Sequence, residues 1–570
     1  MSDPNKPKKE FSMEQRLMLA FALMGLVLIG STYLIPSTTP SPKQAAKATP
    51  PTATPAPAQK AQPGPSPAPA TPAAKPGAAV PAAKAVAAAT EERIEVDTDL
   101  YKVVFSNRGA VVQSWVLKKY TDSNGKPLEL VNQTAVAKSG YPFGIRFHND
   151  QPSDVVNGGL YAVSISDDRL TVDFEFSDGV WTARKTFAFK PKSYLAQIHS
   201  EVRNSGVSKP HLLNWRGGFG DGSVIGAAAS QKSVRFDMSE NKLKSLPSGD
   251  LKEPQAHRGR FSFAGIEDAY FAAVALPDAG EDFEIHSIGD NVPNAIDKKE
   301  ELNAGVAIGG SGENSFQFFA GPKDTDLLKS ISPRLAQLVD FGWFFFISQP
   351  LFQSVHWLND KYLHNYGWTI IVITVIINFL LLPLKITSLK SMKKMSLLQP
   401  QIAAINEKYR GMSFKDPKKQ QQNQEVMDLY KKHGVNPMGG CVPMVLQIPF
   451  FIAFYNVLSV AIEMRGAHWL WVTDLSRPET IPIRILPIAM IATQFIMQKM
   501  TPATTADPSQ QRIMLLMPLF LGFMFYGVSS GLVLYWLTGN VVGIAQQWFF
   551  NRTFHAPVPA VPAAPKKKKS

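Results

Sequence analysis

The sequence is almost free of cysteine, because Cys441 is the only one among its 570 residues. A single thiol forms no intramolecular disulfide and no cysteine metal cluster. The H-E-x-x-H pattern of zinc proteases and the Gly-rich phosphate loop of nucleotide enzymes do not occur either. These absences predict a protein that is not an enzyme and that needs no metal and no cofactor.

Ionised side chains are nearly missing from six long apolar runs. The runs are Leu17–Ile35, Gly367–Leu384, Cys441–Ile462, Ile481–Met497, Ile513–Val528 and Gly531–Phe550. A helix of about 20 apolar residues crosses the hydrocarbon core of a bilayer, so we predict six membrane helices. Carriers coupled to protons or ions usually hold ionisable groups at mid-membrane. The one charge here, Arg484, stands close to the end of its run, which argues against such a carrier.

Residues 36–90 contain no aromatic side chain, no Leu, no Ile and no acid. Such a segment buries too little surface to offset its ordering entropy, so it is predicted to be a disordered linker. Residues 1–35 before it are predicted to be a cytoplasmic end and an uncleaved membrane anchor. A cleaved signal peptide is the alternative, although a signal core usually has about 7–15 residues.

Residues 91–322 alternate apolar and polar side chains with a period of two. Examples are Thr171–Phe176, Lys185–Lys190 and Ser315–Ala320, and Gly, Asn, Asp and Ser clusters separate such runs. The pattern indicates a large antiparallel β domain whose strands bury one face. Because the anchor starts in the cytoplasm, we expect this domain on the outer side, which is the periplasm of a cell with two membranes.

Residues 323–366 are predicted to form an interfacial amphipathic region. Within it, Asp324–Phe346 is expected to be one helix, because six apolar residues recur at helical spacing. They are Leu327, Leu328, Ile331, Leu335, Leu338 and Val339. Phe341–Ile347 adds aromatic rings that suit the depth of lipid headgroups.

Positive charge is concentrated directly after the second apolar run. Between Lys385 and Lys432 there are eleven Lys or Arg against four acids. Residues 385–437 are therefore predicted to be a cytoplasmic hairpin of two amphipathic helices. The basic tail 553–570 is placed on the same side, so both termini are expected in the cytoplasm.

The last two apolar runs are separated by Ser529 and Ser530 alone, which predicts a tight helical hairpin. Gly527–Gly531 matches the G-x-S-x-G pattern of serine hydrolases. That motif needs a strand before the serine, whereas here it lies between two apolar runs. We therefore interpret it as a turn.

Uncharged polar side chains lie on the faces of the apolar runs. Thr374 and Asn378 are four residues apart, as are Trp536 and Asn540, so each pair shares a helix face. A single group of this kind is usually a hydrogen bond between helices, worth about 0.6 kcal/mol. Several on four runs raise a second interpretation, a wet cavity between the helices.

These runs and motifs together resemble the YidC membrane protein insertases, a family related to insertases of mitochondria and chloroplasts. The resemblance is carried by Asp340–Phe352, Pro383–Ile402, Asn436–Tyr455 and Ser530–Asn540. It implies a multidomain fold: a polytopic α-helical membrane protein with a five-helix insertase core at residues 367–552, and a periplasmic antiparallel β-supersandwich. The core would surround a hydrophilic groove open to the cytoplasm and to lipid.

The resemblance also implies an inner-membrane chaperone that works alone or with the Sec translocon. The expected partners are nascent membrane proteins, the Sec translocon, the ribosome and anionic lipids, and no DNA. By position, the groove residues are Thr374, Asn378, Gln447, Tyr535, Trp536 and Asn540, with Lys385 at the groove mouth and Lys390, Lys393 and Lys394 on the basic face of the hairpin.

One position departs from the family. Its members usually have an arginine where this chain has Asn378, so an account based on that positive charge does not carry over. Two other functions stay open at this point. The helices could form a channel or carrier for a small solute, and the β domain could be a tethered enzyme of carbohydrate chemistry.

Overall fold

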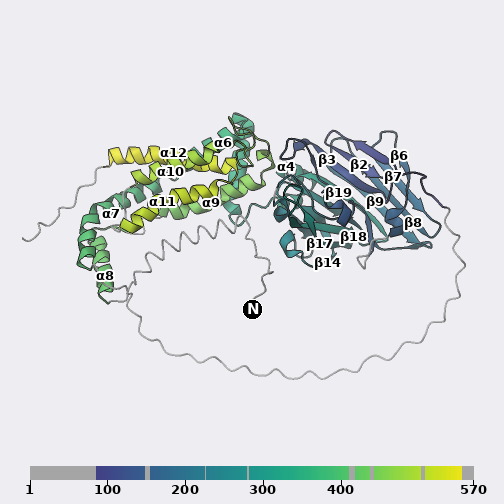
Figure 1. Ribbon diagram of the computed structural model, residues 1–570, viewed down its shortest axis with the longest axis horizontal. Helices are drawn as coiled ribbons and strands as arrows, with labels where there is room; N and C mark the ends of the chain where they lie inside the picture. Colours follow the sequence, from purple (N-terminus) through teal and green to yellow (C-terminus); the bar gives the residue numbers. More distant parts are fainter. Residues whose placement is uncertain are drawn as a thin grey trace, which may run out of the picture.

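The computed structural model describes residues 85–147, 154–224, 226–278, 281–409, 417–436, 442–501 and 508–554. A β-rich part and a helical part lie next to each other along the long axis of the molecule (Figure 1). The predicted anchor Leu17–Ile35, most of the predicted linker and the tail from residue 555 onward fall outside the described residues.

Three antiparallel sheets form the β-rich part. The first has the order β1 (Arg93–Asp97), β2 (Tyr101–Ser106), β3 (Val111–Thr121), β4 (Pro127–Glu129). The second has the order β13 (Lys242–Pro247), β12 (Lys232–Asp237), β15 (Phe261–Glu267), β16 (Phe271–Pro277), β19 (Glu313–Pro322), β9 (Leu195–Asn204), β8 (Trp181–Phe189), β7 (Thr171–Ser177), β6 (Ala162–Ile165), with β10 (Val207–Ser208) beside β9. The third has the order β14 (Gln255–Gly259), β17 (Phe283–Pro293), β18 (Glu300–Gly309), β11 (His211–Trp215), β5 (Ile145–Phe147).

The alternating pattern produces these sheets because one face of each strand enters a shared core. In β7, Val172 and Phe174 are buried, while the alternating residues Thr171, Asp173 and Glu175 are not. Rings from all three sheets meet in the core: the ring centre of Trp115 of β3 lies 6.2 Å from that of Trp215 of β11 and 6.1 Å from that of Phe318 of β19. The prediction of antiparallel strands in this part of the chain is confirmed.

The β domain begins earlier than the sequence indicated. The amide of Val86 donates to Ser177 O at 2.9 Å, and the amide of Ala88 donates to Leu160 O at 3.0 Å. The last residues assigned to the linker therefore pair with the edge of the second sheet. With the bond from Ser177 N to Val86 O at 2.7 Å there are three such backbone bonds. They leave no trace in the apolar pattern, which is why composition alone places the boundary too late.

The predicted single helix Asp324–Phe346 is wrong. The segment forms α4 (Thr325–Ile331) and a 3₁₀ turn, η3 (Leu335–Leu338), and the helix α5 (Phe345–Leu358) begins only at the end of the predicted span. Pro333 has no amide hydrogen for a helix, so the helical spacing across it did not correspond to one element. The side chains of Leu328, Leu335, Leu338 and Val339 belong to the hydrophobic core of the β domain.

The apolar runs after residue 366 are helical. The helices are α6 (Tyr366–Leu380), α7 (Leu382–Lys408), α8 (Pro417–Lys432), α9 (Val442–Val460), α10 (Ile485–Met500), α11 (Pro508–Phe525) and α12 (Ser530–Thr553). Among the described residues, no single helix combines the length and apolar composition that a bilayer crossing needs. Taken together, Phe345–Leu363 and Tyr366–Leu380, bent by 119°, meet that requirement.

The predicted tight hairpin of the last two runs is also not formed. Residues 526–529 separate α11 from α12, and α10 packs against both helices. Figure 1 shows α10 between α12 and α11. The short gap between the two apolar runs limits the length of their connection. It does not predict that a third helix packs between the two helices.

The hairpin of α7 and α8 projects from the end of the helical part that is farthest from the β domain (Figure 1). A small core of Met395, Leu398, Ile402, Tyr430 and Val435 joins the two helices. Around it, Lys408 Nζ contacts Glu425 Oε1 at 2.7 Å and Gln422 Nε2 donates to Asn406 Oδ1 at 2.6 Å. The hairpin is thus a small helical unit with its own core.

A buried ion pair joins the β domain to the loop between α9 and α10. Asp221 accepts from the guanidinium groups of Arg465 and Arg477, and Arg465 also donates to Thr121 O at 2.8 Å. The Arg465 side chain is 6% exposed and lies over the ring of Tyr270. This cluster, which we call the outer joint, fixes the loop against the β domain.

A second polar contact ties α5 to the same loop. His356 Nε2 lies 2.9 Å from Glu463 Oε1, and Nδ1 lies 3.2 Å from Asp360 Oδ2. The hydrogen bond with Glu463 raises the pKa of His356 to about 9, and the charge of Asp360 adds to this effect. His356 is therefore an imidazolium at neutral pH and holds α5 against the loop.

This histidine predicts a pH-dependent stability. Because its pKa is higher in the folded protein, its contribution is complete below about pH 6.5 and is lost as the pH rises through about 9. We expect His356→Gln to lower the stability by about 2 kcal/mol at pH 6, with little effect at pH 10. Thermal unfolding in detergent at both pH values measures this. His468→Gln, an exposed histidine of the same loop, is the control; an equal loss at both pH values would contradict the assignment.

Candidate functional site

Two glycines of α12 lie where this helix packs against α6, α7 and α10. A Cβ at Gly539 would lie 4.0 Å from Asn378 Nδ2. A Cβ at Gly543, one turn later, would lie 3.4 Å from Lys385 Nζ and 3.0 Å from Met497 Sδ. Small residues four apart let helix backbones come together in membrane proteins. Here they leave space for two polar side chains.

A polar hollow lies where α6, α7, α9 and α12 meet. Its lining includes Asn378, Lys385, Gln447 and Tyr535, together with the apolar Ile377, Leu381, Leu384 and Phe450. The hollow has a volume of about 30 Å³, which is enough for roughly two water molecules. The structure thus brings four of the predicted groove and mouth residues together from four different helices.

Asn378 and Lys385 are linked through one side chain of α12. Lys385 Nζ donates to Gln546 Oε1 at 2.9 Å, and Gln546 Nε2 donates to the backbone oxygen of Asn378 at 3.3 Å. The side-chain amide of Asn378 donates to the backbone oxygen of Thr374 at 2.9 Å. The chain stays helical through this region, since Leu381 N bonds to Ile377 O and Lys385 N bonds to Leu381 O. Lys385 therefore points back towards α12 beside the hollow.

Sequence reasoning missed Gln546. Its signal was present, because Gln546 and Gln547 are adjacent polar residues inside an apolar run. The side-chain amide of the neighbouring Gln547 donates instead to Asn551 Oδ1 at 3.0 Å on its own helix. Successive helix residues point about 100° apart, so two adjacent glutamines reach different neighbours.

Three other predicted groove residues lie outside the lining of this hollow. Thr374 is fully buried, and its hydroxyl donates to Ile370 O at 2.6 Å. Trp536 donates to Gln494 Oε1 at 3.3 Å and packs its ring against Phe451 and Phe525.

Asn540 is also turned away from the hollow, towards α10. Its amide donates to Met490 O at 3.3 Å and to Thr493 Oγ1 at 3.2 Å. In this structure Trp536 and Asn540 thus connect α12 to α10, as the helix-to-helix interpretation expects.

The predicted basic face of the hairpin lies at the start of α7. Lys390 and Lys394 are exposed, and Lys393 is half-buried. The ammonium of Lys390 lies 4.5 Å from the ring centre of Phe554, just after α12. A cation–π contact of this kind is worth about 0.5–1 kcal/mol at an exposed site. It ties the root of the hairpin to the end of the last helix.

The G-x-S-x-G segment forms a helix start. Ser529 is the residue before α12, and the Ser530 hydroxyl donates to Arg477 O at 2.7 Å. The Ser530 amide donates to the same oxygen at 2.7 Å. These bonds place α12 against the loop that carries the outer joint, which agrees with the interpretation of this motif as a turn.

Comparison with known proteins gives matches over both parts of the chain. A family model described as 60Kd inner membrane protein matches residues 357–557, and one described as YidC periplasmic domain matches residues 93–354. The protein named membrane protein insertase YidC from Geotalea daltonii is 34% identical over 569 residues, which cover 95% of this chain and 100% of the relative. Its namesake from Geobacter sp. (strain M21) is 35% identical over 483 residues, which cover 82% of this chain and 86% of the relative.

A solved structure also aligns with most of the chain. It is described as an active YidC insertase with the first transmembrane domain resolved. The alignment covers 82% of this chain and 94% of that chain, with 19% identity and a TM-score of 0.36.

The glycines of α12 predict a contrast between two substitutions. Gly539→Ala meets nothing closer than 4.0 Å and gains helix propensity, so the protein should keep or slightly raise its stability. Gly543→Leu forces its side chain against Met497 and Lys385, which should cost about 1–3 kcal/mol. Thermal unfolding of the purified protein in detergent measures both. A Gly543→Leu variant that unfolds at the temperature of the unchanged protein would show that α12 is not held this closely against Met497 of α10 and Lys385 of α7.

Proposed function

Since the chain belongs to the YidC family of membrane protein insertases, we propose that it moves nascent membrane-protein segments from the cytoplasm into the bilayer along the polar hollow. The observation that carries the proposal is the meeting of Asn378, Lys385, Gln447 and Tyr535 where α6, α7, α9 and α12 come together. Polar groups from four helices in one place offer a partner to a polar flank that is leaving water.

The physical task is to carry a short polar flank across hydrocarbon. Each backbone group without a hydrogen-bond partner costs several kcal/mol there. A polar hollow part of the way through the protein shortens the path without partners. The apolar residues of the incoming segment then favour its release sideways into lipid. Hydrophobic burial drives this route, so it requires no catalytic step.

The arrangement in the membrane follows from charge and from the position of the elements. We place six helices across the bilayer, namely the anchor Leu17–Ile35 and α6, α9, α10, α11 and α12, with both termini in the cytoplasm. The basic hairpin of α7 and α8 then lies in the cytoplasm, as the positive-inside rule favours. The β domain and the loop between α9 and α10 then share the periplasmic side, and their contact through the outer joint supports this orientation.

The partners follow from the same arrangement. The lysines at the root of the hairpin and the tail Lys566–Lys569 offer positive charge to ribosomal RNA and to anionic lipid. A surface lysine contributes about 1 kcal/mol near an anionic membrane. We place the ribosome and anionic lipids on this side, and the Sec translocon beside the helices for longer substrates.

A channel or carrier for a small solute is the weaker candidate. The relatives that match most of this chain are named insertases. They favour insertion over solute transport.

The polar character of Asn378 is predicted to matter for insertion. Asn378→Leu removes a donor and an acceptor from the hollow and should slow insertion of a short test protein roughly tenfold, about the effect of one hydrogen bond. Asn378→Gln keeps both groups and should retain most of the activity. Ile376→Leu, on the exposed side of α6, is the matched control. Insertion into vesicles during translation is the measurement, and full activity of Asn378→Leu would show that this site only holds helices together.

Lys385 is predicted to select substrates by charge. It lies beside Asn378, where the family usually has an arginine, and it supplies a positive charge at the edge of the hollow. Lys385→Ala should slow test proteins with acidic N-terminal flanks several-fold more than matched proteins with neutral flanks. Lys385→Arg should keep the difference small. The same vesicle assay compares the two substrates, and equal slowing of both by Lys385→Ala would refute a role for its charge.

A further inference from the structure

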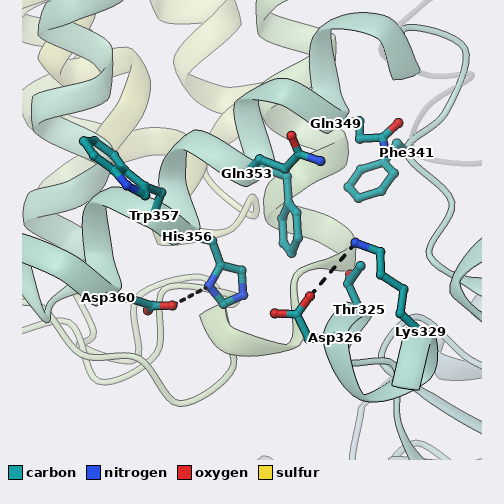
Figure 2. A pocket seen from close by; sticks show the side chains of 10 residues that line it. Thr325, Asp326, Lys329, Phe341, Gln349, Gln353, His356, Trp357 and Asp360 are labelled. Atoms are coloured by element: carbon teal, nitrogen blue, oxygen red, sulfur yellow. Dashed lines mark hydrogen bonds and ion pairs between the residues drawn. The ribbon is translucent and has the colours of Figure 1, made fainter. Parts of the chain in front are cut away.

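A second, larger cavity lies between the β domain and the helical part. Its volume is about 240 Å³, eight times that of the polar hollow. Figure 2 shows its polar walls: Asp326 and Lys329 come from α4, and Gln349, Gln353 and His356 come from the facing side of α5. Asp360, just after α5, also lines the cavity. The residues assigned to insertion do not line this cavity.

Several polar groups of this cavity are available to a ligand. Lys329 contacts Asp326 at only 4.0 Å, and both side chains are more than half exposed. The side-chain amides of Gln349 and Gln353 lie one helical turn apart, and within the described residues they make no hydrogen bond to the protein. Amide groups and a loosely paired ammonium together match the acceptor oxygens of a phosphate.

The cavity lies beside a band of exposed aromatic side chains. Trp343, Phe345 and Phe346 precede or begin α5 and are 76%, 59% and 62% exposed. Trp357, on the same helix, lines the cavity and is 57% exposed. Exposed Trp and Phe of this kind are favoured at the depth of lipid headgroups. These exposed rings therefore favour a position of the cavity at the membrane depth where lipid phosphates and headgroup amines occur.

The charges around the cavity favour a ligand that carries both signs. Lys329 and His356 are positive, whereas Asp326, Asp360 and the adjacent Glu463 are negative. This leaves one negative charge in excess. An anionic headgroup would add to the excess, whereas a headgroup with its own ammonium places that group near the carboxylates.

We propose that this cavity binds the phosphoethanolamine headgroup of a membrane lipid. The phosphate faces Lys329 and the two glutamine amides, and the ammonium faces Asp360 and Asp326. The acyl chains leave past the exposed rings of α5. The proposal rests on the membrane-surface position of α5 that the proposed function implies, and a lipid held here would support the contact between α4 and α5.

The test measures binding of short-chain lipids to the purified full chain in an uncharged detergent. We expect saturable binding of dihexanoyl phosphatidylethanolamine and at least tenfold weaker binding of the matching phosphatidylglycerol. Lys329→Gln should weaken phosphatidylethanolamine binding about tenfold. Asp360→Asn should reduce the preference between the two lipids. The exposed Lys242→Gln on β13 is the control and should bind as the unchanged protein does.

Two soluble probes separate a lipid from a free ligand. Glycerophosphoethanolamine and inorganic phosphate should bind much more weakly than the lipid, because they lack the chains that contact α5. Equal binding of either one would overturn the lipid assignment. So would phosphatidylethanolamine binding that is unchanged in both Lys329→Gln and Gln353→Ala. These readouts do not depend on insertion activity, so the proposed function and the lipid site fail separately.

Discussion

A bilayer offers no hydrogen-bond partner, and the helical part of this protein is arranged around that constraint. Several of its polar side chains find hydrogen-bond partners on their own helix or on a neighbouring one. Thr374 and Asn378 bond to carbonyl oxygens one turn earlier, and Lys385 bonds to Gln546 across the interface. Gly539 and Gly543 of α12 leave room for the side chains of Asn378 and Lys385, so that Lys385 of α7 reaches Gln546 of α12. The hollow is where Asn378, Lys385, Gln447 and Tyr535, from α6, α7, α9 and α12, come together.

The periodicity of side chains predicted much of the fold. Period-two alternation placed strands such as β7 and β19, because a half-buried sheet needs one apolar face. Uncharged runs placed α6, α9, α10, α11 and α12. Neither signal described the segment after β19. Leucines at helical spacing lie on both sides of Pro333 there, and their side chains are buried in the core of the β domain. Nor did either signal place α10 between α11 and α12, since the order of helices depends on packing that no single run contains.

The site was predictable to the level of helix faces. Residues four apart share a helix face, and on that ground Asn378 was assigned to the side of Thr374, but only Asn378 lines the hollow. Which helix stands opposite that face required the structure. Tyr535 and Trp536 illustrate the limit: they are neighbours in sequence, but Tyr535 lines the hollow and stacks on Phe454 at 4.1 Å, whereas Trp536 turns to Gln494. A step of about 100° per residue separates the two roles.

The outer joint has a consequence for how the protein tolerates exchange of its parts. Asp221 belongs to the β domain, and its two arginine partners belong to the helical part. A β domain grafted from a relative without an acid at this position would leave two guanidinium groups facing each other in a nearly dry interface. Such a chimera would need a compensating change in the loop between α9 and α10, which carries the two arginines. Exchange of one half is thus expected to require a matched change in the other.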